Sequence, residues 1–169
     1  CLSLATLLIL GGCAGPGTEP SADRPVIVVT TTILGDLAAR VAGDAADVEI
    51  LIPLGADPCT YRPTTEQTRS LLEADLVVSM PKLKAHHWVG VTASMKNLYG
   101  TLPGLVYGWP KNVLHHNGID NSIVDITATV RPQLAIIDGI VGMEGDGPIM
   151  GTPRQSNLIV MGTNPTAVD

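Results

Sequence analysis

The first half of the chain alternates between unbroken apolar runs and runs with helical spacing. Val26–Thr31 is a continuous β-branched segment, which is typical of a buried strand. Ile33–Ala42 follows with apolar residues three and four positions apart, and Gly43 stands where such a helix would end. Val48–Ile52 is a second apolar run, and Pro53 closes it. The pattern therefore predicts a strand, a helix and a strand in this order.

A second helix and a third strand continue the alternation. Thr64–Ala74 has helical spacing, and Thr64 and Gln67 are placed to form a capping box at its start. Leu76–Ser79 reads as a short strand. Strands that alternate with helices favour a parallel sheet with right-handed crossovers. We therefore expect an α/β fold, a parallel sheet of βαβ units with helices on both faces, followed by a loop-rich second half dense in Gly and Pro.

The second half has a weaker pattern. Loops are expected from residue 100 to 118, because Gly, Pro, Asn and His are dense there. A Pro at the first helical position favours a helix opening at Asn164-Pro165, and the chain is expected to continue beyond Asp169. The other elements expected in this half are a helix over Asn121–Val130, a strand over Leu134–Ile137, a glycine-rich loop over Gly139–Pro153 and a strand over Leu158–Met161.

Composition limits the core and the partners. Apolar residues make up 45% of the 169 residues, but aromatic residues only 3%, so the core must consist of Val, Ile, Leu and Ala. The formal charge of −6 is uneven, because residues 80–119 contain every Lys and His of the chain and no Asp or Glu. This asymmetry predicts a local positive field that attracts an anion, with a solvated basic surface as the alternative. A negative overall charge argues against nucleic acid as a partner.

The first residues resemble a bacterial export signal. Leu2–Leu10 is apolar but too short to span a bilayer, and it ends in Leu10-Gly11-Gly12-Cys13. This looks like the end of a truncated lipoprotein signal (residues 1–12), with a Gly/Pro/Ser tether over residues 13–25. It implies lipidation at Cys13 and an extracytoplasmic position, anchored to the bacterial cell membrane. A buried apolar strand that ends in Cys is the alternative.

The loop GADPCTYRP, which begins at Gly55, lies between a predicted strand and a predicted capped helix. With its surroundings (residues 28–78) it resembles the zinc/manganese solute-binding lipoproteins of ABC importers, whose loop reads G-x-D-P-H-x-Y-x-P. The resemblance implies an incomplete βαβαβ lobe over residues 26–79, an ABC permease as partner and a metal ligand at Cys59 in place of the histidine. A thiolate binds Zn²⁺ better than Mn²⁺, so zinc is the metal expected at Cys59. A partly buried, inert thiol is the alternative.

Residues 79–119 and 134–169 carry a different set of motifs, P-K-L-K-x-H-H, S-M-K-N-L-x-G and D-G-I-V-G-M-E-G-x-G-P. They resemble the family named domain of unknown function 362, which implies an α/β fold. Some members carry ferredoxin-like segments, but the chain has no ferredoxin-type Cys cluster, so no iron–sulfur cluster is supported. The two resemblances predict a composite chain that changes ancestry near Met80, with an incomplete second segment over residues 80–169.

Two groups of residues are candidates for chemistry in this second segment. Cationic and amide donors and glycines suit an anion: Lys82, Lys84, Lys96, Asn97, Gly142 and Gly145. Imidazoles with a carboxylate suit a metal ion or acid–base chemistry: His86, His87, His115 and His116, with Glu144 or Asp138. Surface or capping roles are the alternative for both groups. Three functions stay open: a metal-binding importer component, an enzyme acting on a small anionic substrate, and a chain without independent activity.

Overall fold

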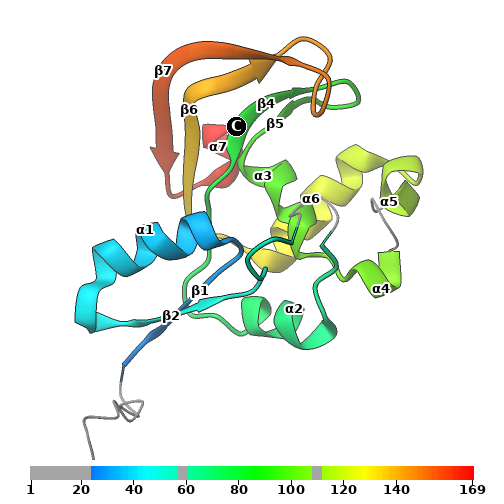
Figure 1. Ribbon diagram of the computed structural model, residues 1–169. Helices are drawn as coiled ribbons and strands as arrows, with labels where there is room; N and C mark the ends of the chain where they lie inside the picture. The colour runs from blue at the N-terminus through cyan, green and yellow to red at the C-terminus, as the bar shows by residue number, and fades with distance from the viewer. Residues whose placement is uncertain (1–23, 57–60, 108–111) are drawn as a thin grey trace, which may run out of the picture.

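The computed structural model describes residues 24–56, 61–107 and 112–169, which form two sheets and the helices around them (Figure 1). The first sheet has two parallel strands, β1 (Val26–Val29) and β2 (Asp47–Ile50). Helix α1 (Thr32–Ala42) and a single 3-10 turn, η1 (Gly43–Ala45), connect them. The βαβ unit expected from the apolar pattern is confirmed. Gly35 lets α1 approach this sheet, since a Cβ there would lie 2.7 Å from the Ile50 side chain.

Helix α2 (Thr65–Leu72) begins with the predicted capping box. The Gln67 backbone N–H donates to the Thr64 hydroxyl, and the Thr64 N–H donates to the Gln67 side chain. The amide nitrogen of Gln67 also donates to the Leu51 carbonyl at 3.1 Å, which ties the start of α2 to the end of β2. A capping residue therefore also fixes the helix against the first sheet.

The second sheet is built around one long strand, β6 (Leu134–Glu144). On one edge it pairs in parallel with β3 (Val78–Ser79) and β4 (Lys82–His86), and β4 pairs with β5 (Gly90–Thr92) in antiparallel orientation. On the other edge β6 pairs antiparallel with β7 (Thr152–Gly162). The α/β class is confirmed, but this sheet is mixed, and β3 belongs to it and not to the sheet of β1 and β2.

The expected glycine-rich loop over Gly139–Pro153 was wrong. Most of this stretch is strand, and the turn between β6 and β7 is confined to residues 145–151. The glycines allow close strand packing, because a Cβ at Gly142 would lie 3.1 Å from the Leu83 carbonyl oxygen. A β-carbon at Gly139 would lie 2.5 Å from the Leu158 side chain. The number of glycines indicated a loop. In the structure these glycines lie in a strand, where the absence of a side chain lets neighbouring strands approach closely.

Short helices occupy much of residues 100–118, where loops were expected to dominate. They are the end of the 3-10 turn η2 (Leu98–Thr101), α4 (Gly104–Tyr107) and α5 (Asn112–His116). Helix α3 (Ser94–Asn97) precedes this segment. The expected helix is present as α6 (Ile119–Val130), and α7 (Pro165–Val168) begins at Asn164 as predicted. The main apolar cluster packs η2 against α6 through Leu98, Tyr99, Ile119, Ile126 and Val130.

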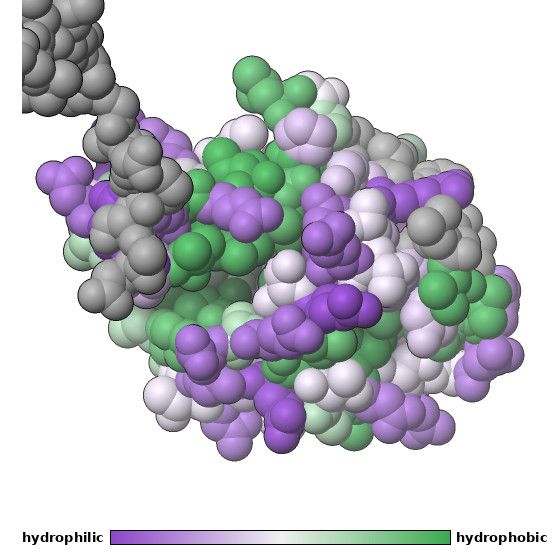
Figure 2. All heavy atoms as spheres, turned by 90° about the horizontal axis from the view of Figure 1, so that it is seen from below, coloured by the Kyte–Doolittle hydropathy of each residue, from purple (hydrophilic) through white to green (hydrophobic). Residues whose placement is uncertain are grey.

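Several large apolar side chains remain exposed. Ile33 and Val41, two turns apart on α1, are 75% and 89% exposed. The face seen from below shows green, apolar areas between purple, polar ones (Figure 2). In the part of the chain that the structure describes, no helix is long and apolar enough to cross a membrane.

The turn between β6 and β7 should tolerate no side chain at Gly147. A Cβ there would lie 2.0 Å from the Ala85 carbonyl oxygen, a backbone atom of β4 that cannot rotate away. We expect Gly147→Ala to lower the free energy of unfolding by about 2 kcal/mol or more, as overpacking does. Urea denaturation measures the change. Gly100→Ala is the matched control, because nothing lies within 4 Å of a Cβ there; equal stability of the two variants would contradict the close approach.

Candidate functional site

Six aromatic and imidazole rings gather where β4 turns into β5, and we call them the ring cluster: His86, His87, Trp88, Tyr99, His115 and His116. The His86 ring stacks on His87 and on His115, with centroids 5.2 Å and 6.3 Å apart. Trp88 meets His115 and His116 edge-on at 5.4 Å and 5.3 Å. The structure therefore brings all four predicted histidines together, from β4 and its turn on one side and from α5 on the other.

His86 is the buried imidazole of the ring cluster, with a relative exposure of 7%. The Trp88 backbone N–H donates to its Nδ1 at 3.2 Å. Burial, followed by the neighbouring groups Lys96, His87, His115 and Lys84, lowers the pKa of His86 to about 4. His86 is therefore a neutral imidazole at physiological pH, held in a positive local field.

His87 has a different role from its neighbour. It is exposed, and its Nδ1 lies 2.7 Å from the Gly147 carbonyl oxygen, so this nitrogen carries a proton and donates. Its backbone N–H donates to the same oxygen at 3.1 Å. His87 thus fastens the turn between β6 and β7 onto the end of β4.

Lys96 links the ring cluster to a small cavity. Its Nζ lies 3.8 Å from the centroid of the Tyr99 ring, a cation–π contact. Burial raises the pKa of Tyr99, to which the charge of Asp120 adds, so the phenol stays protonated. The cavity next to this pair has a volume of about 190 Å³. Its lining residues are Val89, Val91, Met95, Lys96, Asp120, Ile123 and Asp169.

Asp169 holds the helix that carries Lys96. Its two carboxylate oxygens accept hydrogen bonds from the backbone N–H groups of Ser94 and Met95, both at 2.7 Å. These are the first N–H groups of α3, which have no partner within the helix. The carboxylate therefore fixes α3 from a segment more than seventy residues later in the chain.

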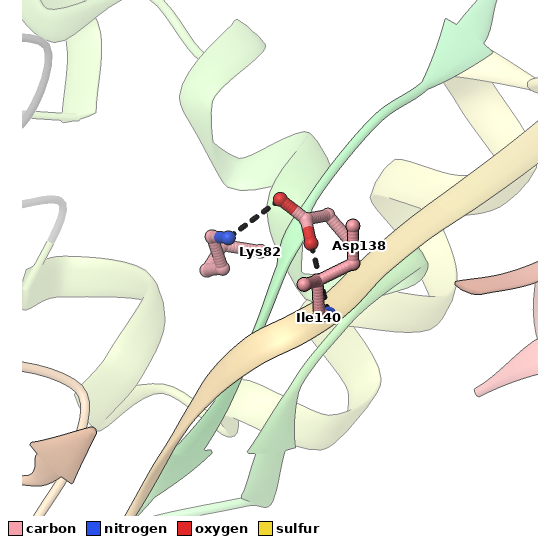
Figure 3. Close-up of polar contacts among 3 residues, drawn as sticks. All are labelled: Lys82, Asp138 and Ile140. Carbon is pink, nitrogen blue, oxygen red and sulfur yellow. Dashed lines mark hydrogen bonds and ion pairs between the residues drawn. The ribbon is translucent and has the colours of Figure 1, made fainter. Parts of the chain in front are cut away.

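Lys82 and Asp138 form an ion pair across β4 and β6 (Figure 3). The Lys82 Nζ lies 2.5 Å from one oxygen of Asp138, and the Ile140 N–H donates to the other oxygen at 3.0 Å (Figure 3). The hydrogen bond from Lys82 lowers the pKa of Asp138. Both residues were candidates for a site, and the structure places them in a partly exposed contact between strands.

The other predicted site residues lie in different surroundings. Asn97 donates to the Ser79 hydroxyl at 3.3 Å, and the Glu144 carboxylate pairs with Arg154 at 3.2 Å. Gly142 lies within β6, and Gly145 opens the following turn with φ +80°. Lys84 is half-buried in β4 and contributes to the field at His86. Of the anion-binding candidates, Lys96 is the one that lines the small cavity.

A metal centre at the ring cluster would need a third ligand beside two imidazoles. The described residues contain no group of three or more His, Cys, Asp or Glu side chains arranged to hold a metal ion. Glu144 and Asp138, the carboxylates expected to join the histidines, are engaged by Arg154 and Lys82. Cys13 and Cys59 lie outside the described residues.

Sequence reasoning missed Trp88, Tyr99, Asp120 and Asp169. Trp88 directly follows the histidine pair, so its position was a usable signal. Tyr99 follows Lys96 by three positions, a spacing that brings two side chains onto one helical face. Asp120 and Asp169 reach the cavity from α6 and from beyond α7, and no local pattern indicates either contact.

One protein-family model matches most of the chain. The model of the domain of unknown function 362 (DUF362) matches residues 18–169. The chain belongs to the DUF362 family. The match begins well before Met80 and includes both strands of the first sheet. Similarity to this family therefore extends across the point where the sequence was expected to change ancestry.

Curated relatives match shorter stretches of this DUF362 chain. A thylakoid-associated protein of Synechocystis sp. is 33% identical over 104 residues, which are 60% of this chain and 32% of the relative. The manganese ABC transporter substrate-binding lipoprotein of Streptococcus pneumoniae serotype 4 is 30% identical over 76 residues, 45% of this chain and 25% of the relative.

An iron ABC transporter substrate-binding lipoprotein of Streptococcus pyogenes is 30% identical over 73 residues, 43% of this chain and 24% of the relative. The chain thus spans about a third or a quarter of the length of the curated relatives it matches. Resemblance to metal importers is partial, and the relatives' names include manganese and iron. No solved structure matches significantly.

The low pKa of His86 should make stability depend on pH. In the unfolded chain this imidazole takes up a proton near its ordinary pKa of 6.5. In the folded state it takes up the proton only near its lowered pKa of about 4. The free energy of unfolding should therefore fall as the pH falls from about 6.5 to about 4, and level off below. Urea denaturation across this range measures it, and ¹H NMR of the ring gives the folded pKa.

His86→Asn keeps an acceptor near the Nδ1 position and removes the titration, so it should flatten this part of the profile. His116→Gln is the control, since His116 is exposed. A profile that is unchanged in His86→Asn, or an ordinary pKa for the His86 ring, would contradict the assignment.

Proposed function

We propose that this chain binds a small oxyanion, a carboxylate or a phosphate, in the cavity beside Lys96. The observation that carries the proposal is the placement of Lys96 on the cavity wall, with its Nζ 3.8 Å above the Tyr99 ring. An ammonium group held over a ring loses less conformational freedom when it binds an anion. The ligand would meet a preoriented cation and not a flexible surface lysine.

The local field supports an anion further. The positive charges of Lys96 and Lys84 act on His86, and both residues come from the acid-free segment of residues 80–119. The charge of Lys96 on the cavity wall raises the local concentration of an anion there. The Asp169 carboxylate on the same cavity is compensated by two backbone N–H donors.

The role we propose is binding. The two oxygens of Asp169 accept backbone hydrogen bonds, and the Nδ1 of His86 accepts one from Trp88. These groups hold the site in place.

Lys96→Met should weaken binding of propionate and of inorganic phosphate by about tenfold or more, because it removes the charged donor. Isothermal titration at neutral pH measures the affinity. The same change should raise the pKa of His86, since the charge of Lys96 lowers it. Lys82→Met is the matched control, because Lys82 does not line this cavity. Equal affinities in Lys96→Met and wild type, or no binding of either anion, would reject the proposal.

A second candidate function follows from the partial similarity to metal importers. In this proposal the chain is a bacterial lipoprotein, anchored through Cys13 on the outer side of the membrane, that delivers Zn²⁺ held by Cys59 to an ABC permease. Its support is the loop GADPCTYRP and the lipobox-like Leu10-Gly11-Gly12-Cys13. The thiolate is the reason for zinc, although the relatives' names state manganese and iron.

Two cysteine variants test the zinc site and the membrane anchor of this second candidate separately. Cys59→Ser should weaken zinc binding of the full chain by about tenfold or more and leave membrane association unchanged. Cys13→Ser should do the opposite, releasing the chain from the membrane fraction of a bacterial host. Titration with zinc and with manganese, and fractionation of cells, are the measurements. Zinc binding that is equal in wild type and Cys59→Ser would exclude Cys59 as a ligand.

A further inference from the structure

We propose that the ligand of this cavity is a zwitterion, a small carboxylate that also carries a protonated amine, and that Asp120 receives the amine. The inference rests on the proposed function, because Lys96 must bind the carboxylate. It adds the chemical class of the ligand and a residue that would select it.

The cavity presents opposite charges from two elements. Lys96 comes from α3, and Asp120 comes from the first turn of α6. A ligand that carried only negative charge would be repelled by the Asp120 carboxylate. A ligand with a carboxylate and an ammonium group places each charge next to its opposite, so both protein charges then favour binding.

The second carboxylate at the cavity is already used. Both oxygens of Asp169 accept backbone N–H groups at 2.7 Å, which hold α3. Asp120 forms no hydrogen bond or ion pair with another described residue, and it is exposed. Its charge nevertheless reaches the ring beneath Lys96, since burial and then Asp120 raise the pKa of Tyr99. Asp120 is therefore the carboxylate that can receive a ligand amine.

Asp120 also has a structural role at the start of α6, and the experiment must distinguish this role from ligand binding. A carboxylate in the first turn of a helix is stabilised by the helix dipole, and this needs no ligand. That role predicts an effect of Asp120 on stability alone. The ligand role predicts an effect that depends on whether the ligand carries an amine.

The size and walls of the cavity suit a small ligand. Its volume of about 190 Å³ has room for a small α-amino acid. Val89, Val91, Met95 and Ile123 supply apolar walls, which suit a short alkyl side chain. L-alanine is the probe that follows, with propionate as its counterpart without the amine and ethylamine as its counterpart without the carboxylate.

Titration of the full chain at neutral pH with these three probes tests the inference. L-alanine should bind about tenfold more tightly than propionate, since one charge-assisted contact is added, and ethylamine should bind more weakly than L-alanine. Asp120→Asn should reduce L-alanine to the affinity of propionate without weakening propionate. Asp120→Glu should keep the preference for L-alanine. Asp125→Asn is the matched control, since Asp125 is an exposed carboxylate of the same helix that lines a different cavity.

The outcomes separate this inference from the proposed function. Equal affinity for L-alanine and propionate, both lost in Lys96→Met, would overturn the zwitterion and leave the oxyanion site standing. A preference for L-alanine that persists in Asp120→Asn would overturn the role of Asp120. No binding of propionate, phosphate or L-alanine would overturn both. If Asp120→Asn does not fold, as thermal unfolding would show, wild type and Asp120→Glu decide between the probes.

Discussion

The second sheet depends on the pairing of β6 along both of its edges. Ala135 pairs with Ser79 on one edge and with Gly162 on the other, and Asp138 pairs with Lys82 and Ile159. A strand bonded on both edges leaves few backbone groups unpaired, so its direction and register are fixed. β5 is attached to this strand through β4, and α3 and α7 contact it directly.

The cavity follows from that attachment. β4 places His86 at its end, and the turn after β6 is held there by the contacts of His87 with Gly147. β7 then leads the chain to Asp169, which returns to the start of α3 and orients Lys96. The proposed ligand site is thus assembled from β5, α3, α6 and the last described residue, and no single segment could form it.

Exposed apolar side chains lie in rows along α1 and β7. Ile33 and Val41 on α1 and Ile159 and Met161 on β7 are all more than half exposed. Scattered exposed apolar residues are common in soluble domains, but rows along one helix or strand are less so. The chain spans a third or less of the curated relatives that it matches, and these rows belong to the part that is shared with the family.

The sequence by itself determined the local elements of the first half of the chain. Helical spacing and the cap at Thr64 identified α1 and α2, and the four histidines and Lys96 stood in an acid-free segment that marked the region of the site. Only the tertiary structure decided which strands share a sheet, that Gly139 and Gly142 lie within a strand, and which charges face one cavity. Local propensity depends on neighbours within a few residues, whereas strand partners and the approach of Asp120 and Asp169 to Lys96 depend on contacts between distant segments.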